Sequence, residues 1–376
     1  MDFYYYFKSN QGKMINLLKE IVSLESPSGD QKAVNACSSF VIKEFKKAGA
    51  KITRFPQDEI GDLYLAEIPS SVPKKEEEQI LLLTHIDTVW KVGKIEKMPF
   101  YISGDKAFGP GVLDMKASLV MAIYSLKALN ELNIRPGKKI AVFINSAEEI
   151  GHKAPYNTIR KLSQKSAYAL CLEPSLPGGA LKIQRKGRLV IRLEAKGKAA
   201  HAGYPEKGIN AIEELMAQLS NIQKIKTKET TVNIGLIGGG EKPNIVAEEA
   251  WAILDMRFWN TFKKEEIIHF LKQMKAELQG ARVKYTVESF TPPMEHTSAS
   301  AGLLSRVKEI ASSLNMEIDT GKTGGGSDAS IASSLGIPTL DGLGPEGEGI
   351  HAENEYLNLS SLIKRTALLT ELLIQL

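Results

Sequence analysis

The sequence predicts an α/β protein with a mixed, largely parallel sheet flanked by helices, into which a smaller α+β domain is inserted. Three observations predict this fold. Short apolar runs that indicate fully buried strands lie at 80–84, 140–144 and 168–172. Helix-period apolar stripes separate these runs, an alternation typical of parallel sheets. After residue 182 the pattern changes to strands with one polar face, and a chain of 376 residues is long enough for two domains.

Two helices are expected before the first strands of the sheet. Apolar residues share one helical stripe over 12–24, and the same spacing returns over 33–41 after the Ser-Pro-Ser-Gly break at 26–29. A third helix is expected from residue 118, ahead of the strand at 140–144.

The inserted domain is predicted from the order of its elements. Strands are expected at 188–194, 230–237, 248–258 and 281–288, and helices at 210–222 and 262–278. This β-α-β-β-α-β order is that of a ferredoxin-like unit. We therefore predict a discontinuous larger domain, 1–182 with 292–376, and an inserted domain, 183–291.

Composition argues against several classes of function. Lysine and arginine number 48 against 44 aspartate and glutamate, and without a basic cluster we expect neither a nucleic-acid partner nor a membrane partner. Residues 1–8 lack the features of a secretory signal, and no apolar run reaches the length of a membrane span. The two cysteines, Cys37 and Cys171, are expected to be reduced, which predicts a cytoplasmic protein.

Residues that bind metals follow the predicted strands. His85, Glu149 and Glu173 each come just after an apolar run, and ligands collect at the carboxyl ends of strands in an open parallel sheet. In the His-x-Asp pattern Asp87 lies on the same side of the chain as His85 and can hold its other ring nitrogen, as zinc-bound histidines require. Taken alone, this pattern also fits a histidine–aspartate pair on the surface or in the core that binds no metal.

Two more acidic positions have open alternatives. Asp114 follows a Gly-Pro-Gly turn, where it can either cap the next helix or bridge two metal ions. Glu148 and Glu149 are either an acid-rich helix start or one ligand and one free base, because adjacent carboxylates in a cleft repel unless a cation lies between them. In the second interpretation Glu149 binds metal and Glu148 is the general base for a metal-activated water.

Together with His351, these residues make a two-zinc hydrolase site. His85 with Glu173 would hold one ion, His351 with Glu149 the other, and Asp114 would bridge them, which leaves room for a water. Cobalt and manganese share these ligand types and are possible substitutes for zinc.

Two glycine-rich segments outside these runs are candidate substrate contacts. The segment with Gly325, Gly326 and Ser327 offers backbone donors for a substrate carboxylate, but it is neither a nucleotide loop nor a serine-hydrolase elbow. His201 lies on a loop of small residues, where a lone histidine is usually solvent-exposed and has no functional role.

These residues resemble the co-catalytic zinc exopeptidases and amidohydrolases, a family that includes glutamate carboxypeptidase, acetylornithine deacetylase, succinyl-diaminopimelate desuccinylase, aminoacylase and peptidase T. The resemblance spans nearly the whole chain, closest to the glutamate carboxypeptidase branch. It rests on Thr84 to Val89, Gly109 to Lys116, Glu148 with Glu149, Leu172 to Pro174, Gly197 to Gly203, Gly324 to Asp328, and Gly349 to His351.

The resemblance implies a zinc-exopeptidase fold whose inserted domain is a lid and dimerisation domain, and therefore a homodimer. It implies that His85, Asp114 and Glu173 bind one zinc ion and that Asp114, Glu149 and His351 bind the other. It also implies that Glu148 is the general base. It further implies that His201 polarises the scissile carbonyl in the partner's site, and that Asn244 and Arg257 hold the substrate carboxylate. The stretch 287–293 has no arginine where some carboxypeptidase relatives supply one, which does not favour glutamate specificity.

The sequence thus predicts a cytoplasmic dizinc hydrolase whose substrate is a small peptide or N-acyl amino acid. A carboxypeptidase is the leading interpretation. An N-acyl amino acid deacylase and a di- or tripeptidase are alternatives within the hydrolases, and a metal-binding relative without turnover is the alternative outside them.

Overall fold

The computed structural model describes residues 2–71 and 78–376, and the chain forms two compact units. The first unit comprises Met1–Ile183, His296–Lys322 and Ser327–Leu376, and the second comprises Gln184–Glu295 with Thr323–Gly326. Among the described residues, no helix is long and apolar enough to cross a membrane.

The first unit is built on a mixed six-stranded sheet. Its strand order is β1-β2-β6-β3-β7-β14, in which β6, β3, β7 and β14 run parallel, β2 pairs antiparallel with β6, and the edge strand β1 pairs antiparallel with β2. The fold prediction is therefore confirmed, although β1 and β2 were not expected. The strands are β1 (Lys51–Phe55), β2 (Leu63–Ile68), β3 (Gln79–His85), β6 (Lys139–Asn145), β7 (Ser166–Cys171) and β14 (Thr339–Leu340).

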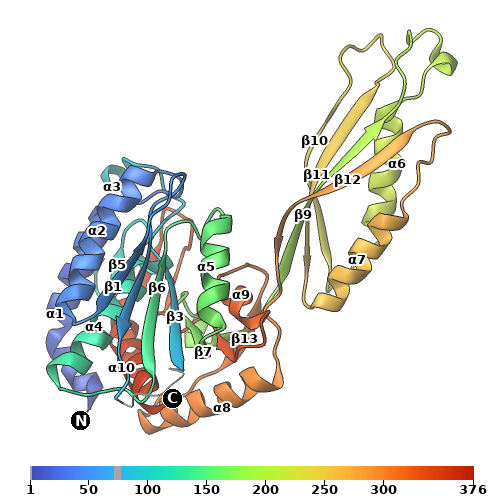
Figure 1. Ribbon diagram of the computed structural model, residues 1–376. Coiled ribbons are helices and arrows are strands. Elements are labelled where there is room, and N and C mark those ends of the chain that lie inside the picture. The colour runs from blue at the N-terminus through green and yellow to red at the C-terminus, as the bar shows by residue number, and fades with distance from the viewer. Residues whose placement is uncertain (1, 72–77) are drawn as a thin grey trace. The chain divides into compact units, whose positions relative to one another are not determined.

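Helices cover both faces of this sheet. Figure 1 shows α1, α2 and α4 on one face and α5 and α9 on the other. Most of α4 is buried, so this helix lies at the centre of the core. The helices are α1 (Phe3–Ser23), α2 (Gln31–Lys47), α3 (Lys94–Lys97), α4 (Ala117–Glu131), α5 (Lys153–Ser163), α8 (Ser298–Ser313), α9 (Ala329–Ser333) and α10 (Leu359–Gln375).

Two small sheets complete the strands outside the inserted segment. Strands β15, β16, β5 and β4 form a four-stranded sheet in that order, and β13 pairs with β8. Their bounds are β4 (Tyr101–Ser103), β5 (Lys106–Phe108), β8 (Leu181–Arg185), β13 (Thr320–Thr323), β15 (Gly347–Glu348) and β16 (Tyr356–Asn358).

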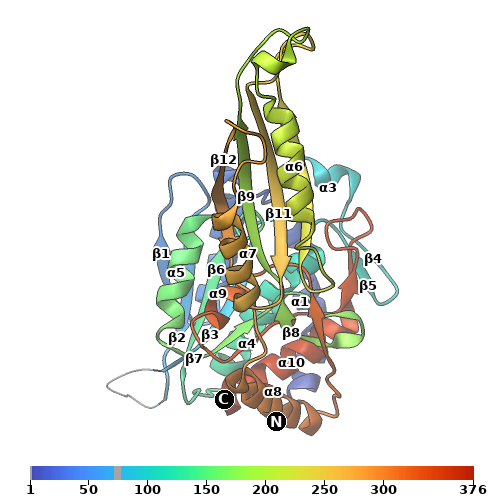
Figure 2. The same cartoon turned by 90° about the vertical axis from the view of Figure 1, so that its right-hand side faces the viewer.

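The second unit has the predicted β-α-β-β-α-β order. Its antiparallel sheet has the order β10-β11-β9-β12, and Figures 1 and 2 show α6 and α7 on the same face of it. Apolar residues of the sheet and the two helices form a separate core. The elements are β9 (Gly187–Lys196), α6 (Ala211–Gln223), β10 (Thr231–Gly239), β11 (Glu249–Phe258), α7 (Thr261–Gln273) and β12 (Arg282–Thr291).

Two helix boundaries differ from expectation, each for a physical reason. Helix α1 begins well before residue 12, because the Asp2 side chain caps it and Phe3 and Phe7 are buried. Helix α7 ends at Gln273 rather than 278, because the backbone N–H groups of residues 277 and 278 donate to the buried carboxylate of Glu214 instead of continuing the helix.

Candidate metal centre

Three adjacent parallel strands deliver polar residues to one edge of the six-stranded sheet. His85 is the last residue of β3 and is in register with Asn145, the last residue of β6. The chain continues from β6 into Glu148 and Glu149, and from β7 into Glu173. Because β3 lies between β6 and β7, His85 lies between the two acidic segments, as the rule for ligands at strand ends predicts.

Asp114 lies in the irregular turn Val112–Lys116. Gly111 starts this turn with a φ of 69°, and a Cβ there would lie 2.6 Å from a Thr88 methyl, so glycine is required. The Asp114–Met115 peptide bond is cis. The alternative that Asp114 caps the next helix is wrong, because α4 starts after Lys116 and has no side-chain cap.

The two carboxylate oxygens of Asp114 face different histidines. Oδ1 lies 3.1 Å from His85 Nε2, and Oδ2 lies 3.4 Å from His351 Nε2. His85 Nε2 is also 3.6 Å from Glu173 Oε1, and His351 Nε2 is 3.1 Å from Glu149 Oε1. The structure thus brings the five predicted ligands together, with Asp114 between two pairs. Their binding of metal stays a prediction.

Glu148 lies close to the same cluster. Within residues 2–71 and 78–376, two groups of side chains have ligand atoms within 4.8 Å of one another: His85 with Glu148 and Glu173, and His85 with Asp114 and Glu149. The proposed base is therefore near enough to the ligands to act on a molecule held between them.

The cluster has an excess of negative charge. Burial, with the charge of Glu173, raises the pKa of Glu148 well above its usual range. Hydrogen bonds to Asp114 and Glu149 raise the pKa of His351 to about 10. Burial opposes ionisation of Asp114, but hydrogen bonds from the two imidazoles outweigh it and lower its pKa. Divalent cations would balance this charge, and imidazole and carboxylate donors suit zinc, cobalt or manganese. The residues therefore fit a dinuclear centre.

Asp87 is fully buried and joins the His85 segment to the glutamate pair. Its carboxylate accepts hydrogen bonds from the backbone N–H groups of Glu148 and Glu149, at 3.1 and 3.2 Å, and from the Ser28 hydroxyl at 2.6 Å. The backbone carbonyl of Asp87 lies 3.0 Å from His85 Nδ1, closer than Asp87 Oδ1 at 3.6 Å. The main chain therefore orients the ring more directly than the expected carboxylate, which positions the glutamates.

Three residues near the cluster were not selected from the sequence. Asn145 donates to the Asp328 carboxylate at 2.7 Å and accepts from the Ala147 N–H at 2.9 Å, which fixes the turn before Glu148. Burial raises the pKa of Asp328 to about 6. The third is Glu355, whose buried carboxylate accepts from the Asp114 N–H at 3.1 Å. A polar residue at the end of an apolar strand was the available signal for Asn145.

His201 and Asn244 belong to the second unit and are exposed. Their loops are neighbours, because the Ala202 N–H donates to the Asn244 carbonyl at 3.0 Å. The His201 ring accepts a hydrogen bond at Nδ1 from the Gly203 N–H, at 3.0 Å. This bond orients the ring with Nδ1 toward the Gly203 backbone and Nε2 away from it.

Arg257 contacts the glycine-rich segment through a carbonyl. Its Nη1 donates to the Gly324 oxygen at 2.8 Å, while Arg185 Nη1 donates to the Gly325 and Gly326 oxygens at 3.2 and 2.7 Å. The arginines thus hold the carbonyls of the segment from which backbone donors were expected. Ser327 belongs to the first unit, where it is buried and donates its hydroxyl to Asp341 at 2.7 Å.

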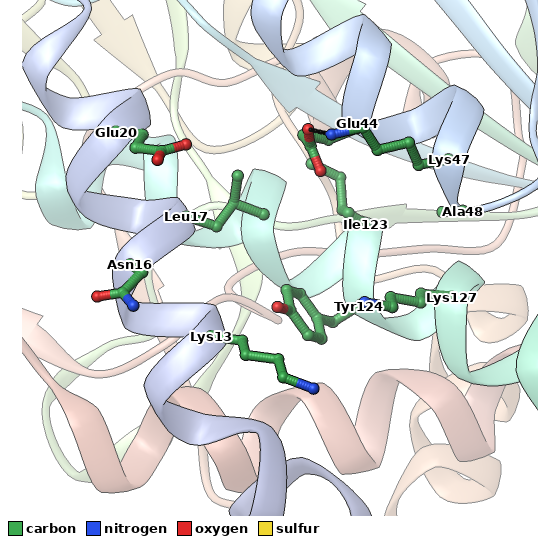
Figure 3. A pocket seen from close by; sticks show the side chains of 10 residues that line it. All are labelled: Lys13, Asn16, Leu17, Glu20, Glu44, Lys47, Ala48, Ile123, Tyr124 and Lys127. Atoms are coloured by element: carbon green, nitrogen blue, oxygen red, sulfur yellow. Dashed lines mark hydrogen bonds and ion pairs between the residues drawn. The ribbon is translucent and has the colours of Figure 1, made fainter.

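Two hollows on the first unit lie away from this cluster. One, of about 310 Å³, is lined by α1, α2 and α4, with Glu20, Glu44 and Tyr124 among its side chains (Figure 3). The other, of about 700 Å³, is lined by the N-terminus of α1, the segment after α8 and part of α10. Neither contains a predicted site residue, so the chemistry rests on the cluster at the strand ends.

Comparison with known proteins gives a family and relatives for this arrangement. The profile of peptidase family M20/M25/M40 matches residues 81–375. Carboxypeptidase G2 of Pseudomonas sp. strain RS-16 is 30% identical over 380 residues, which cover 97% of this chain and 90% of that protein.

Solved structures share the fold. A tripeptidase from Staphylococcus aureus superposes with a TM-score of 0.79 at 24% identity, covering 97% of this chain and 98% of that one. A Bacillus subtilis protein described as a dinuclear metal binding peptidase of the M20 family superposes with a TM-score of 0.75 at 16% identity, covering 98% of each chain.

Proposed function

The chain belongs to peptidase family M20/M25/M40, and from this premise we propose that it is a dizinc carboxypeptidase that releases a C-terminal amino acid from a small peptide. The family makes it a metallopeptidase or amidohydrolase. The observation that carries the finer proposal is the 30% identity to a carboxypeptidase over 97% of the chain. The donor set at the strand ends supports the two ions.

The proposed ligands divide around Asp114. His85 and Glu173 would hold one zinc ion and His351 and Glu149 the other, with Asp114 bridging. When bound, the ions would activate water and polarise the amide carbonyl. Asp87 positions the backbone that carries the glutamates, through bonds to both N–H groups.

Glu148 is the proposed general base. It accepts a proton from the attacking water and delivers it to the leaving amine. Burial and the charge of Glu173 raise the pKa of Glu148, which favours uptake of a proton from water.

Arg257 is the proposed contact for the substrate carboxylate, with Asn244 as its companion. Asp255 accepts from both Arg188 Nε, at 2.6 Å, and Arg257 Nε, at 3.1 Å, so two guanidinium groups share one carboxylate. Burial and the charge of Arg257 lower the pKa of Lys186, which indicates further positive charge nearby. This surplus supports recognition of an anionic group, which a carboxypeptidase substrate carries at its C-terminus.

A homodimer through the second unit is proposed on the exposure of one sheet edge. Strand β10 is at the edge of the sheet, and Leu236 and Ile237 on it are 60% and 58% exposed. Met216 on α6 is 61% exposed. An apolar edge strand is a ready surface for pairing with a second copy. His201 would then act on substrate in the partner's site, and sedimentation of Leu236→Lys, which should be monomeric, tests the assembly.

A reducing compartment is supported by the cysteines. Cys37 and Cys171 are both buried, and burial raises the pKa of the Cys37 thiol, which makes it less reactive. We therefore keep the cytoplasm as the proposed location.

A substrate panel tests the proposed activity. The zinc-loaded protein is offered dipeptides and tripeptides with free or amidated C-termini, N-acetyl amino acids, and peptides with a blocked N-terminus. A carboxypeptidase cleaves N-blocked peptides and fails on C-terminal amides. Preference for N-acetyl amino acids would replace the carboxypeptidase assignment with the deacylase. A requirement for a free N-terminus would indicate a di- or tripeptidase. No turnover on any substrate would favour a non-catalytic relative.

A further inference from the structure

Glu355 is a buried carboxylate held by four hydrogen bonds. It is 1% exposed. Its Oε1 accepts from the backbone N–H groups of Leu113 at 2.9 Å and Asp114 at 3.1 Å. Its Oε2 accepts from the Gly111 N–H at 3.0 Å and from the Trp90 indole at 3.2 Å. The carboxylate thus fills the inside of the turn that carries Asp114.

These contacts join three segments that each supply a proposed ligand. Trp90 lies on the loop that leaves β3 after His85, and the turn at Gly111 carries Asp114. Glu355 itself follows His351 on the loop between β15 and β16. One carboxylate therefore links the backbones that position both histidines and the aspartate between them.

The energetics favour a specific role for this charge. Burying a carboxylate is costly unless hydrogen bonds compensate it, and the buried Lys116, a cation whose charge acts on Glu355, donates its own hydrogen bonds to the Ile21 and Leu24 carbonyls. The donors are instead the N–H groups of the Asp114 turn, which Glu355 holds in one arrangement. A neutral side chain would leave several of these donors with weaker acceptors or with none.

We propose that Glu355 is a positioning residue that fixes Asp114 relative to His85 and His351, and so sets the affinity of the site for its metal ions. This inference rests on the proposed metal centre. Groups that orient metal ligands without touching the ion typically contribute about 10- to 100-fold to metal affinity. Glu355 acts through three ligand segments at once, so we expect an effect toward the upper end of that range.

Glu353 provides a matched control on the same loop. It is an exposed glutamate two positions away, and its carboxylate pairs with Lys94 at 2.5 Å rather than with the Asp114 turn. Glu353→Gln removes the same charge from the same loop and leaves every hydrogen bond to the Asp114 turn in place.

The experiment measures zinc affinity by chelator competition in the full-length protein. We expect Glu355→Gln to weaken binding by about 10- to 100-fold and Glu353→Gln to change it less than about 3-fold. The thermal midpoint of the metal-free protein is recorded for each variant. Trp90 emission is followed in a background with Trp251→Phe and Trp259→Phe, where Glu355→Gln should shift the spectrum because the indole N–H loses its acceptor.

The outcomes separate this inference from the proposals it rests on. Unchanged zinc affinity in folded Glu355→Gln, with only a lower midpoint of the metal-free protein, would show a purely structural role and overturn the inference. Absence of zinc binding in the wild type would overturn the metal centre as well. Neither result depends on the substrate panel. Failure of the carboxypeptidase assignment can therefore be told apart from failure of the role proposed for Glu355. Glu355→Asp, which keeps the charge, should retain more affinity than Glu355→Gln.

Discussion

In the first unit the proposed metal ligands lie close together at the strand ends, whereas His201 and Asn244 of the second unit are exposed on two neighbouring loops. His85 is 1% exposed and its Nε2 lies 3.1 Å from Asp114, while His201 and Asn244 are exposed. The cluster, in which His85 and Asp114 are buried and His351 is half exposed, brings acidic groups together at an electrostatic cost that cations relieve. The exposed residues carry no such cost and can act only on a molecule brought to them. The difference predicts two classes of variant. Substitution of a proposed ligand should lower the metal content, whereas substitution of His201 or Arg257 should change kcat or KM and leave the metal content unchanged.

The largest effect is expected at Glu148. We expect Glu148→Gln to lower turnover by about 10²- to 10⁴-fold, because it removes proton transfer, and to keep the metal content of the wild type. Turnover is measured with the preferred peptide, and the metal content of the same sample is measured by elemental analysis. The surface glutamate Glu59, which pairs with His152 at 3.3 Å, supplies the control Glu59→Gln. Turnover within a few fold of the wild type would refute the base assignment.

His201 should have the next largest effect. His201→Ala removes a proposed donor to the carbonyl oxygen, and removal of one such donor costs on the order of 10²-fold in kcat. Metal content should not change, because the residue is outside the cluster. His269, exposed on α7, gives the comparison variant His269→Ala. Equal rates for the two variants would take His201 out of the mechanism.

Arg257 should affect binding more than chemistry. A hydrogen bond to a charged group contributes about 1.5 to 3 kcal/mol, so Arg257→Met should raise KM by about 10- to 100-fold. Arg282→Met, at an exposed arginine on β12, is the control. The KM should rise only for substrates with a free C-terminal carboxylate. An equal rise for amidated substrates would show that Arg257 supports the unit rather than the ligand.

The strands and the ligand order could be predicted from the sequence because both leave local signals. A buried parallel strand is an uninterrupted apolar run, and His85, Glu149 and Glu173 come directly after such runs. The strands β1 and β2, at one side of the sheet, were missed. The end of α7 was also missed, since the competing acceptor Glu214 is distant in sequence.

The role of Glu355 could not be predicted from the local sequence pattern. Its partners in the Asp114 turn lie up to 244 positions away, and an acidic residue near the end of the chain is usually solvated. The orientation of His85 by a backbone carbonyl is equally invisible, because every residue has such a carbonyl. What the sequence does not reveal here is which distant donors and acceptors the fold brings together.

The most direct measurement of the central claim is the number of divalent ions per chain. Elemental analysis of protein loaded with zinc and freed of excess should give two ions per chain for the wild type. Asp114→Asn, which weakens a carboxylate that lies within 3.4 Å of both histidines, should give fewer than one, with activity lost in parallel. A wild type that retains no zinc, or an Asp114→Asn variant that retains two ions, would contradict the account.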